Sequence, residues 1–176
     1  AIRTRPFGRV ANPATRPHAV FITAIDTAPF APDPVAAVAG RETDLSWGLA
    51  AVVRLTDGPV FVCSRPGRRL PVDEGNRVRH EEFSGPHPAG TAGLHIHRLS
   101  PVRRDREAWH LDAQDLASIG KLLRTGAGDA LRVVSLGGPP VRRPTLFRAP
   151  IGASLEDFAR TDLNIGAHPM GCRVIS

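Results

Sequence analysis

The sequence predicts an α/β fold, with a parallel-sheet layer over residues 1–128 and an incomplete β-grasp module over residues 129–176. Residues 19–23 and 60–63 are apolar runs rich in β-branched residues, typical of strands buried on both faces. Between them, an apolar face with helical spacing runs from Glu42 to Leu55. A strand, a helix and a strand in this order form a βαβ unit, which implies a parallel sheet.

The rest of the first layer follows from weaker patterns. The sequence predicts an extended loop at the prolines of residues 29–34, a third strand near 77–83, a short helix over 91–99 and a strand over 107–111. A further helix starts in the segment from Asp112 to Asp115, which resembles a capping box, and ends at Gly126. Its predicted apolar face consists of Leu116, Ile119, Leu122 and Leu123.

The second module opens with a predicted hairpin. Strands over residues 131–136 and 145–148 flank the turn Gly-Gly-Pro-Pro at 137–140. A helix beginning at Ser154 is expected to turn Leu155 and Phe158 inward, and residues 172–175 would form the next strand. A hairpin, a helix and a strand are the opening elements of a β-grasp.

Composition excludes several classes of protein. No stretch of the 176 residues approaches the ~20 apolar residues that a membrane span needs. The net charge of +6 comes from arginine doublets scattered along the chain without aromatic residues between them, so we expect no nucleic-acid partner. Cys63 and Cys172 lie far apart in predicted strands and are expected to be buried, reduced thiols of a cytoplasmic protein.

Three histidines, His87, His95 and His97, lie within one short segment that is rich in glycine and proline. The spacing permits a metal site, but residues two apart diverge on a helix, so we favour histidines that hydrogen-bond within the fold or line an interface. Glycines before a helix can also hold a phosphate. The segment 25–30 after the first strand has no glycine, however, so a bound dinucleotide is not expected.

Near the amino end, Arg3, Arg5 and Phe7 combine guanidinium donors with an aromatic ring. Such a combination can hold a planar ligand with a polar head by hydrogen bonds and stacking. The alternative is a solvated arm that docks on the rest of a larger protein.

Several strings resemble the A subunit of the bacterial Na+-translocating NADH:quinone reductases. The first is Phe-Ser-Gly-Pro-His-Pro-Ala-Gly at 83–90, with His-Ile-His at 95–97. Similar strings occur in order at residues 3–7, 115–125, 132–136, 144–155 and 173–176. The resemblance implies the middle of that subunit, with a biotinyl/lipoyl-like domain before it and further segments after it. It also implies a Rossmann-like layer followed by the β-grasp called SLBB, related to the flavin subunit of respiratory complex I.

The resemblance implies a peripheral subunit on the cytoplasmic side of the bacterial inner membrane, where the complex couples ubiquinone reduction to sodium export. Its partners would be the other subunits and ubiquinone; NADH, flavins and iron–sulfur clusters would reside on other subunits, with no cofactor bound by this chain, which alone is expected to be inactive. No catalytic or metal-binding residue is expected. Candidate residues for contact with quinone or a neighbouring subunit are Arg3, Arg5, Phe7, His87, His95 and His97.

The sequence departs from the family pattern at Thr91-Ala92, at Leu94 and at Arg98, and the first two exchanges are compatible with the fold. Arg98 stands where the family commonly has phenylalanine, which would alter a docking surface at this loop. The competing hypothesis is a docking or assembly module for neighbouring subunits that has no contact with quinone. One apolar cleft shared by the Arg3–Phe7 arm and the 87–97 segment would favour the quinone hypothesis, whereas a flat exposed face would favour docking.

Overall fold

The computed structural model describes residues 2–157 and 163 and contains two compact units. Residues up to 28, together with 33–129, form the first unit. Residues 29–32 and the described residues from 130 onward form the second. Among the described residues, no helix is both long enough and apolar enough to cross a membrane.

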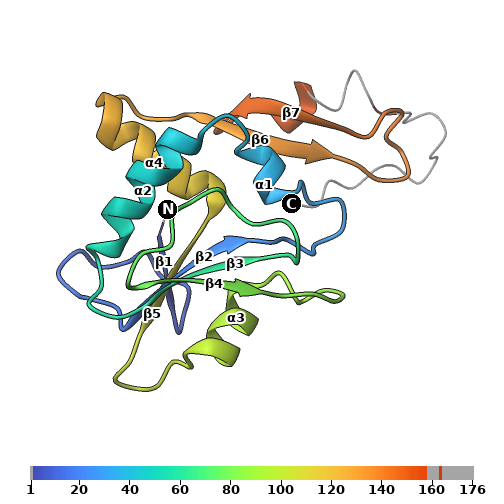
Figure 1. The fold of residues 1–176 in the computed structure, drawn as a ribbon. Coiled ribbons are helices and arrows are strands. Elements are labelled where there is room, and N and C mark those ends of the chain that lie inside the picture. Colours follow the sequence, from blue (N-terminus) through green and yellow to red (C-terminus); the bar gives the residue numbers. More distant parts are fainter. Residues whose placement is uncertain (1, 158–162, 164–176) are drawn as a thin grey trace. The chain divides into compact units, whose positions relative to one another are not determined.

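The first unit is built on a five-stranded sheet (Figure 1). The strands are β1 (Arg3–Arg5), β2 (Ala19–Ala24), β3 (Val60–Ser64), β4 (Val78–Glu82) and β5 (Ala108–Asp112). Their order across the sheet is β1-β5-β2-β3-β4; β2, β3, β4 and β5 run parallel, and β1 pairs antiparallel with β5. The predicted α/β class with a parallel sheet is therefore confirmed.

Helices cover both faces of this sheet. They are α1 (Pro34–Ala37), α2 (Glu42–Val53), α3 (Ala92–Leu99) and α4 (Ala113–Thr125). Figure 1 shows α2 and α4 together on one face and α3 on the other. Alternate residues of β2 divide between the two faces, as the period of a strand requires: Val20 and Ile22 join the α2/α4 core, and Phe21 joins Ile96 of α3.

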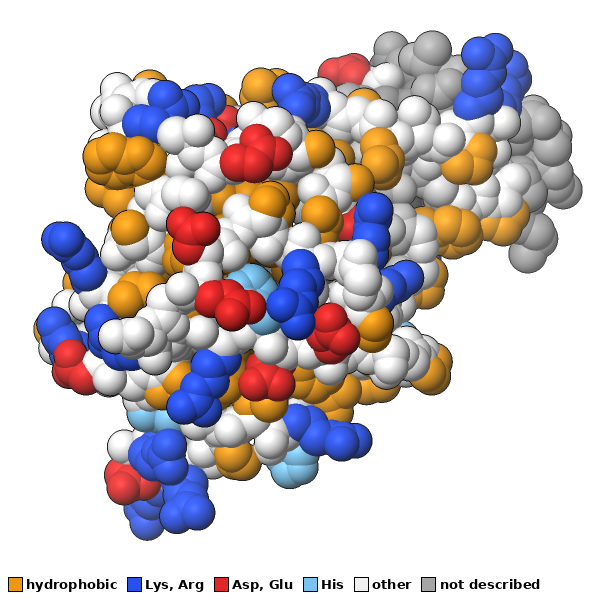
Figure 2. All heavy atoms as spheres, in the orientation of Figure 1, with side chains coloured by type: hydrophobic (Ala, Val, Ile, Leu, Met, Phe, Trp, Pro, Cys, Tyr) orange, Lys and Arg blue, Asp and Glu red, His pale blue; other side chains and the backbone are white. Residues whose placement is uncertain are grey.

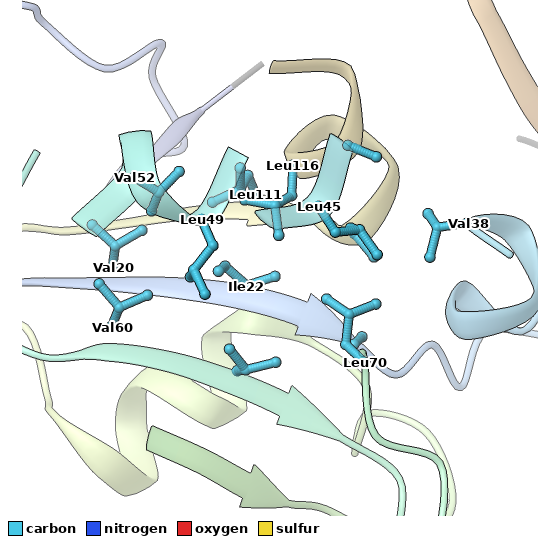
Figure 3. Close-up of a cluster of buried hydrophobic side chains, with 14 of the residues drawn as sticks. Val20, Ile22, Val38, Leu45, Leu49, Val52, Val60, Leu70, Leu111 and Leu116 are labelled. Atoms are coloured by element: carbon cyan, nitrogen blue, oxygen red, sulfur yellow. The ribbon is translucent and has the colours of Figure 1, made fainter. Parts of the chain in front are cut away.

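The larger core fills the space between the sheet and helices α2 and α4. Figure 3 shows its side chains pointing into this space from Val20 and Ile22 of β2, Val60 of β3, Leu45, Leu49 and Val52 of α2, and Leu116 of α4. The opposite face has a smaller cluster, in which the rings of Phe21 and Phe61 stack with centroids 4.8 Å apart. Cys63 is a buried, free thiol on this smaller-cluster face, and burial raises its pKa.

Helices α2 and α4 pack with their backbones in close approach. A Cβ atom at Gly120 would lie 1.7 Å from the Asp44 carbonyl oxygen, and one at Gly48 would lie 2.2 Å from the Leu116 carbonyl oxygen. Only glycine fits such contacts, because a methyl group would overlap with the backbone of the opposite helix.

Ion pairs link the same two helices and the segment that follows α4. Asp44 Oδ1 accepts hydrogen bonds from Arg124 Nε at 3.0 Å and Nη2 at 2.9 Å. Asp129 Oδ2 lies 2.6 Å from Arg41 Nη2, and Asp129 Oδ1 lies 3.1 Å from Lys121 Nζ. Both aspartate side chains are largely buried, so these contacts balance charges that burial would otherwise penalise.

Two segments differ from their predicted structure. Residues 3–5 form the unpredicted strand β1, which excludes for them the solvated arm given as an alternative, because Thr4 is buried and pairs with Trp109 while its neighbours complete the ladder to β5. The loop predicted over 29–34 ends in the short helix α1. Asp33 caps this helix by accepting a hydrogen bond from Val35 N at 2.9 Å, and Pro34 fits its first turn because that position needs no N–H donor.

The apolar face of α4 is also narrower than predicted. Leu122 and Leu123 are 48% and 54% exposed, so their inward assignment is wrong. The helix buries Ala113, Leu116, Ala117 and Gly120, a stripe of mostly small residues that lets α2 come close.

The described part of the second unit is an antiparallel hairpin of β6 (Leu131–Leu136) and β7 (Thr145–Pro150). Its register runs from the pair Leu131–Pro150 to the pair Leu136–Thr145, which confirms the predicted hairpin. Residues 155–157 are helical. Leu155 is exposed in this segment, so its predicted inward orientation is wrong, whereas Phe158 and the strand predicted at 172–175 lie outside the described residues.

Candidate functional site

A cavity of about 490 Å³ opens at the carboxyl edge of the sheet in the first unit. It lies where β2 and β5 end, and these neighbours mark the point at which the strand order reverses: β3 and β4 follow on one side of β2, and β5 returns to the other. Parallel sheets of this kind bind ligands at this switch point. We call it the switch cavity; it is lined by Arg3, Arg5, Thr23, Ile25, Asp26, Pro34, Gly90, Thr91, Ala92, His110, Leu111, Asp112 and Asp115.

Strand β1 directs two arginines to this site. Arg3 pairs with His110 across the β1–β5 ladder, so their side chains lie on the same face of the sheet. Arg5 lies two residues further along β1 and therefore shares that face. Since His110 pairs with Phe21 of the smaller core, this is the face covered by α3. The two arginines thus meet the beginning of α3 in one cavity.

Acidic side chains complete the rim. Asp26 follows β2, and its Oδ1 accepts a hydrogen bond from Ala28 N at 2.8 Å. Asp112 caps α4 by accepting from Asp115 N at 2.6 Å. Two arginines and three aspartates leave the lining without an excess of positive charge. Basic and acidic side chains are likewise interspersed over the face of the first unit that Figure 2 shows.

The loop before α3 is fastened to the loop after β2. Thr27 Oγ1 accepts a hydrogen bond from Gly90 N at 2.9 Å and shares another with His87 Nδ1 at 3.2 Å. A Cβ atom at Gly90 would lie 2.6 Å from Thr27 N, so this approach requires glycine. These contacts hold one wall of the switch cavity against the other.

His110 stands out among the lining residues. Its Nε2 atom is buried and has no hydrogen-bond partner among the described residues. Burial, and then the charges of Arg5 and Arg3, lower the pKa of His110 to about 4. The ring is therefore neutral at physiological pH, with one N–H donor and one acceptor nitrogen.

The structure separates the residues that the sequence singled out. Arg3 and Arg5 line the switch cavity. Phe7, His87 and His97 are exposed outside its lining; Phe7 is 81% exposed in the turn after β1. His95 is fully buried: its Nε2 donates to the Ala89 carbonyl at 2.8 Å, its ring contacts Phe83, and burial lowers its pKa.

The histidines therefore do not gather at one point. Within the described ranges, no group of three His, Cys, Asp or Glu side chains lies close enough to hold a metal ion. The residues that reach the switch cavity from the 87–97 segment are Gly90, Thr91 and Ala92 instead.

Sequence reasoning missed His110 and Asp26 as site residues. Both were detectable in principle, because each stands at or near the carboxyl end of a predicted strand, where parallel sheets bind ligands. Their proximity depends on β5 returning beside β2, which the order of elements along the chain does not reveal.

The fold and the switch cavity define an α/β domain of the doubly wound class, with helices on both faces of a mostly parallel sheet. A family model described as "NqrA second alpha/beta domain" matches residues 1–128, and the chain belongs to this family. The resemblance found in the sequence is thereby confirmed.

Curated relatives agree with this assignment. The chain is 45% identical over 165 residues to the A subunit of the Na(+)-translocating NADH-quinone reductase from Alcanivorax borkumensis, covering 94% of this chain and 37% of the relative. It is 42% identical to the protein of the same name from Cellvibrio japonicus and 43% to that from Serratia proteamaculans. Each of these two alignments covers 176 residues, which is 100% of this chain and 38% of the relative. The chain thus spans less than two fifths of the length of these relatives.

Proposed function

We propose that this chain is the central part of the A subunit of a Na+-translocating NADH–quinone reductase. In this role it serves an enzyme complex that oxidises NADH, reduces ubiquinone and exports sodium. The subunit is peripheral, lies on the cytoplasmic side of the bacterial inner membrane and works with neighbouring subunits that carry the flavins and iron–sulfur clusters. Membership of the family and the names of the relatives support this proposal.

Within that complex, we propose that the switch cavity contacts ubiquinone. The observation that carries this proposal is that Arg3 and Arg5 meet Gly90, Thr91 and Ala92 in one cavity. The amino-terminal strand and the 87–97 segment thus share a cleft, as expected of a ligand site, with a lining that mixes charged and apolar side chains in place of the apolar lining that was expected.

The charge of the lining favours an uncharged ligand over a nucleotide. Three aspartates offset Arg3 and Arg5, and the loop after β2 lacks the glycines that bring backbone N–H groups to a pyrophosphate. A quinone head is neutral and planar and carries carbonyl oxygens that accept hydrogen bonds. The guanidinium groups of the two arginines are suitable donors for such oxygens.

Substitution of these arginines in the complete complex tests the quinone contact. We expect Arg3→Gln and Arg5→Gln each to raise the KM for ubiquinone-1 about tenfold, because each removes a charged hydrogen-bond donor. The matched control is Arg16→Gln, since Arg16 pairs with the exposed Asp57 at 2.9 Å outside the cavity lining. NADH oxidation by an artificial acceptor checks that the complexes are intact. A KM equal to that of the control in both variants would reject the quinone contact.

A specific observation favours a second role, in docking. The turn after β1 is closed by hydrogen bonds from Thr4 N to the Arg9 carbonyl at 2.8 Å and from Gly8 N to the Thr4 carbonyl at 2.9 Å. This closed turn presents Phe7 to solvent, with the Arg9 guanidinium 5.5 Å from the ring centroid. We propose that Phe7, with the exposed His87 and His97, contacts a neighbouring subunit. Failure of the complex to assemble in Phe7→Ser, with quinone affinity of the isolated subunit retained, is the result expected from this role.

For the overall division of the chain, we propose a Rossmann-like domain over residues 1–128 and the first part of a β-grasp (SLBB) domain over 129–176. The hairpin of β6 and β7, followed by the helical residues 155–157, supports the second assignment because a β-grasp begins with a hairpin and a helix. A structure of the complete subunit tests it: further strands should join the β6–β7 sheet. A hairpin that remains two-stranded there would reject the β-grasp.

A further inference from the structure

We infer that His110 is the residue of the switch cavity that pairs with the occupant in both of its redox states, by a hydrogen bond between its ring and an oxygen of the quinone or quinol head. This inference rests on the proposed quinone contact and adds a residue and a chemical role to it. His110 is not among the candidate residues that the sequence patterns single out.

The position of His110 is the first support. It lies two residues before the end of β5, so its side chain sits further inside the sheet than that of Asp112 at the rim. Its neighbours across the ladders are Arg3 on one side and Phe21 on the other. The imidazole is thus placed between a charged donor and an aromatic side chain, in the lining of the cavity.

The unsatisfied Nε2 atom is the second support. A buried polar nitrogen without a partner carries a desolvation penalty, and such atoms are rare in folded proteins. Among the described residues, nothing pairs with Nε2. A ligand oxygen that reaches Nε2 from the cavity would supply the missing hydrogen bond.

The chemistry of a neutral imidazole lets His110 pair with both redox states, including the hydroxyl donor of a quinol, with which a guanidinium cannot pair as an acceptor. A guanidinium only donates hydrogen bonds, which suits the carbonyl oxygens of a quinone. The Nε2 atom of a neutral imidazole donates a hydrogen bond in one tautomer and accepts one in the other. It can therefore donate to a quinone carbonyl and accept from a quinol hydroxyl, without any proton leaving the protein.

Binding measurements on the complete subunit test the inference, with ubiquinone-1 and, under anaerobic conditions, ubiquinol-1 as probes. We expect His110→Leu to weaken the binding of both about tenfold, because it removes donor and acceptor together. His110→Gln should stay within about threefold of the wild type, since an amide also offers both functions. Arg16→Gln, whose exposed side chain pairs with Asp57 outside the cavity lining, is the control and should bind as the wild type does.

The comparison with the arginine variants separates this inference from the proposed function. If Arg3→Gln and Arg5→Gln weaken binding but His110→Leu does not, the quinone contact stands and the role of His110 is overturned. If none of the three weakens binding, the quinone contact itself fails. Binding of pyrophosphate in place of either probe would overturn both.

A second readout guards against a variant that fails to fold. In the wild-type subunit with 15N-labelled histidine, addition of ubiquinone-1 should shift the ring nitrogen resonances of His110, with those of His97 unchanged. Ring resonances of His110 that stay in place at saturating ubiquinone-1 would overturn the inference.

Discussion

Arg3 of β1 and His110 of β5 are cross-strand partners at the switch cavity, with their side chains on the same face of the sheet. The pair joins two segments more than one hundred residues apart in the sequence. Its consequence is electrostatic: a fixed positive charge beside an imidazole disfavours the protonated ring. The Arg3 guanidinium therefore helps to keep the His110 ring neutral.

Removal of either neighbouring arginine should raise the pKa of His110. Burial is the largest cause of the lowered value of about 4, followed by Arg5 and then Arg3. We therefore expect Arg5→Gln and Arg3→Gln to raise the pKa, with burial still holding it below the usual value of about 6.5. NMR titration of the His110 ring measures this shift. An unchanged pKa in both variants would contradict the electrostatic account.

The same shift predicts how His110 contributes to stability at different pH. The unfolded chain binds a proton near pH 6.5 and the folded chain only near pH 4, so the unfolded state holds more protons between these values. The contribution of His110 is present above pH 6.5 and is lost as the pH falls toward 4. Urea unfolding at several pH values should show a smaller loss of unfolding free energy in this window for His110→Leu than for the wild type.

The close approach of α2 and α4 predicts that alanine substitution has opposite effects on stability at two glycines. Gly120→Ala should lower the free energy of unfolding by about 1–3 kcal/mol, because the added methyl group would overlap with the Asp44 carbonyl. Gly93→Ala is the control: it lies in α3 with open space around it, where alanine should stabilise the helix by up to about 1 kcal/mol. Trp47 and Trp109 are both in the first unit, so urea unfolding followed by their fluorescence reports on it. Equal stabilities of the two variants would contradict the packing described for α2 and α4.

Removal of the buried carboxylate of Asp129 should lower the free energy of unfolding far more than removal of an exposed carboxylate. Asp129→Ala removes a partner of both Arg41 and Lys121 and should lower the unfolding free energy by about 3 kcal/mol. Asp57→Ala breaks only the exposed pair with Arg16 and should cost less than about 1 kcal/mol. The same fluorescence measurement compares them, and a similar loss in both would show that burial is not the deciding factor.

The hydrogen bond between Thr27 and Gly90, which fixes one side of the switch cavity, predicts that Thr27 affects ligand binding. Thr27→Val removes the hydroxyl that accepts from Gly90 N, leaves that N–H unpaired and should weaken ubiquinone-1 binding about threefold to tenfold. Thr27→Ser keeps the hydroxyl and should bind nearly as the wild type does. Titration of the complete subunit distinguishes the two, and equal affinities would mean that this hydrogen bond does not shape the site.

Much of the fold was predictable because local sequence patterns indicate its helices and strands. β2 and β3 are continuous apolar runs, and α4 begins at a capping aspartate and ends at Gly126, whose φ of 73° suits glycine. β1 was not predictable in this way. Its three residues contain one buried position, and its structure depends on pairing with β5, far along the chain.

The site was predictable only in part, for a related reason. Arg3 and Arg5 were candidate residues because two arginines lie near an aromatic residue, and both line the cavity. The cluster of histidines at 87–97 was the more conspicuous pattern, yet α3 turns His95 into the core and His97 to solvent. Which residues meet at the carboxyl edge is decided by the order of strands in the sheet, and that order is a tertiary property.

Photolabelling of the complete complex tests the central claim, that the switch cavity receives the quinone. A photoreactive ubiquinone analogue should label peptides that span residues 3–5, 23–26, 90–92 or 110–115, the segments that contribute lining residues, and excess ubiquinone-1 should suppress the label. Labelling confined to other subunits, with none on this chain, would contradict the claim and leave the chain with a docking role.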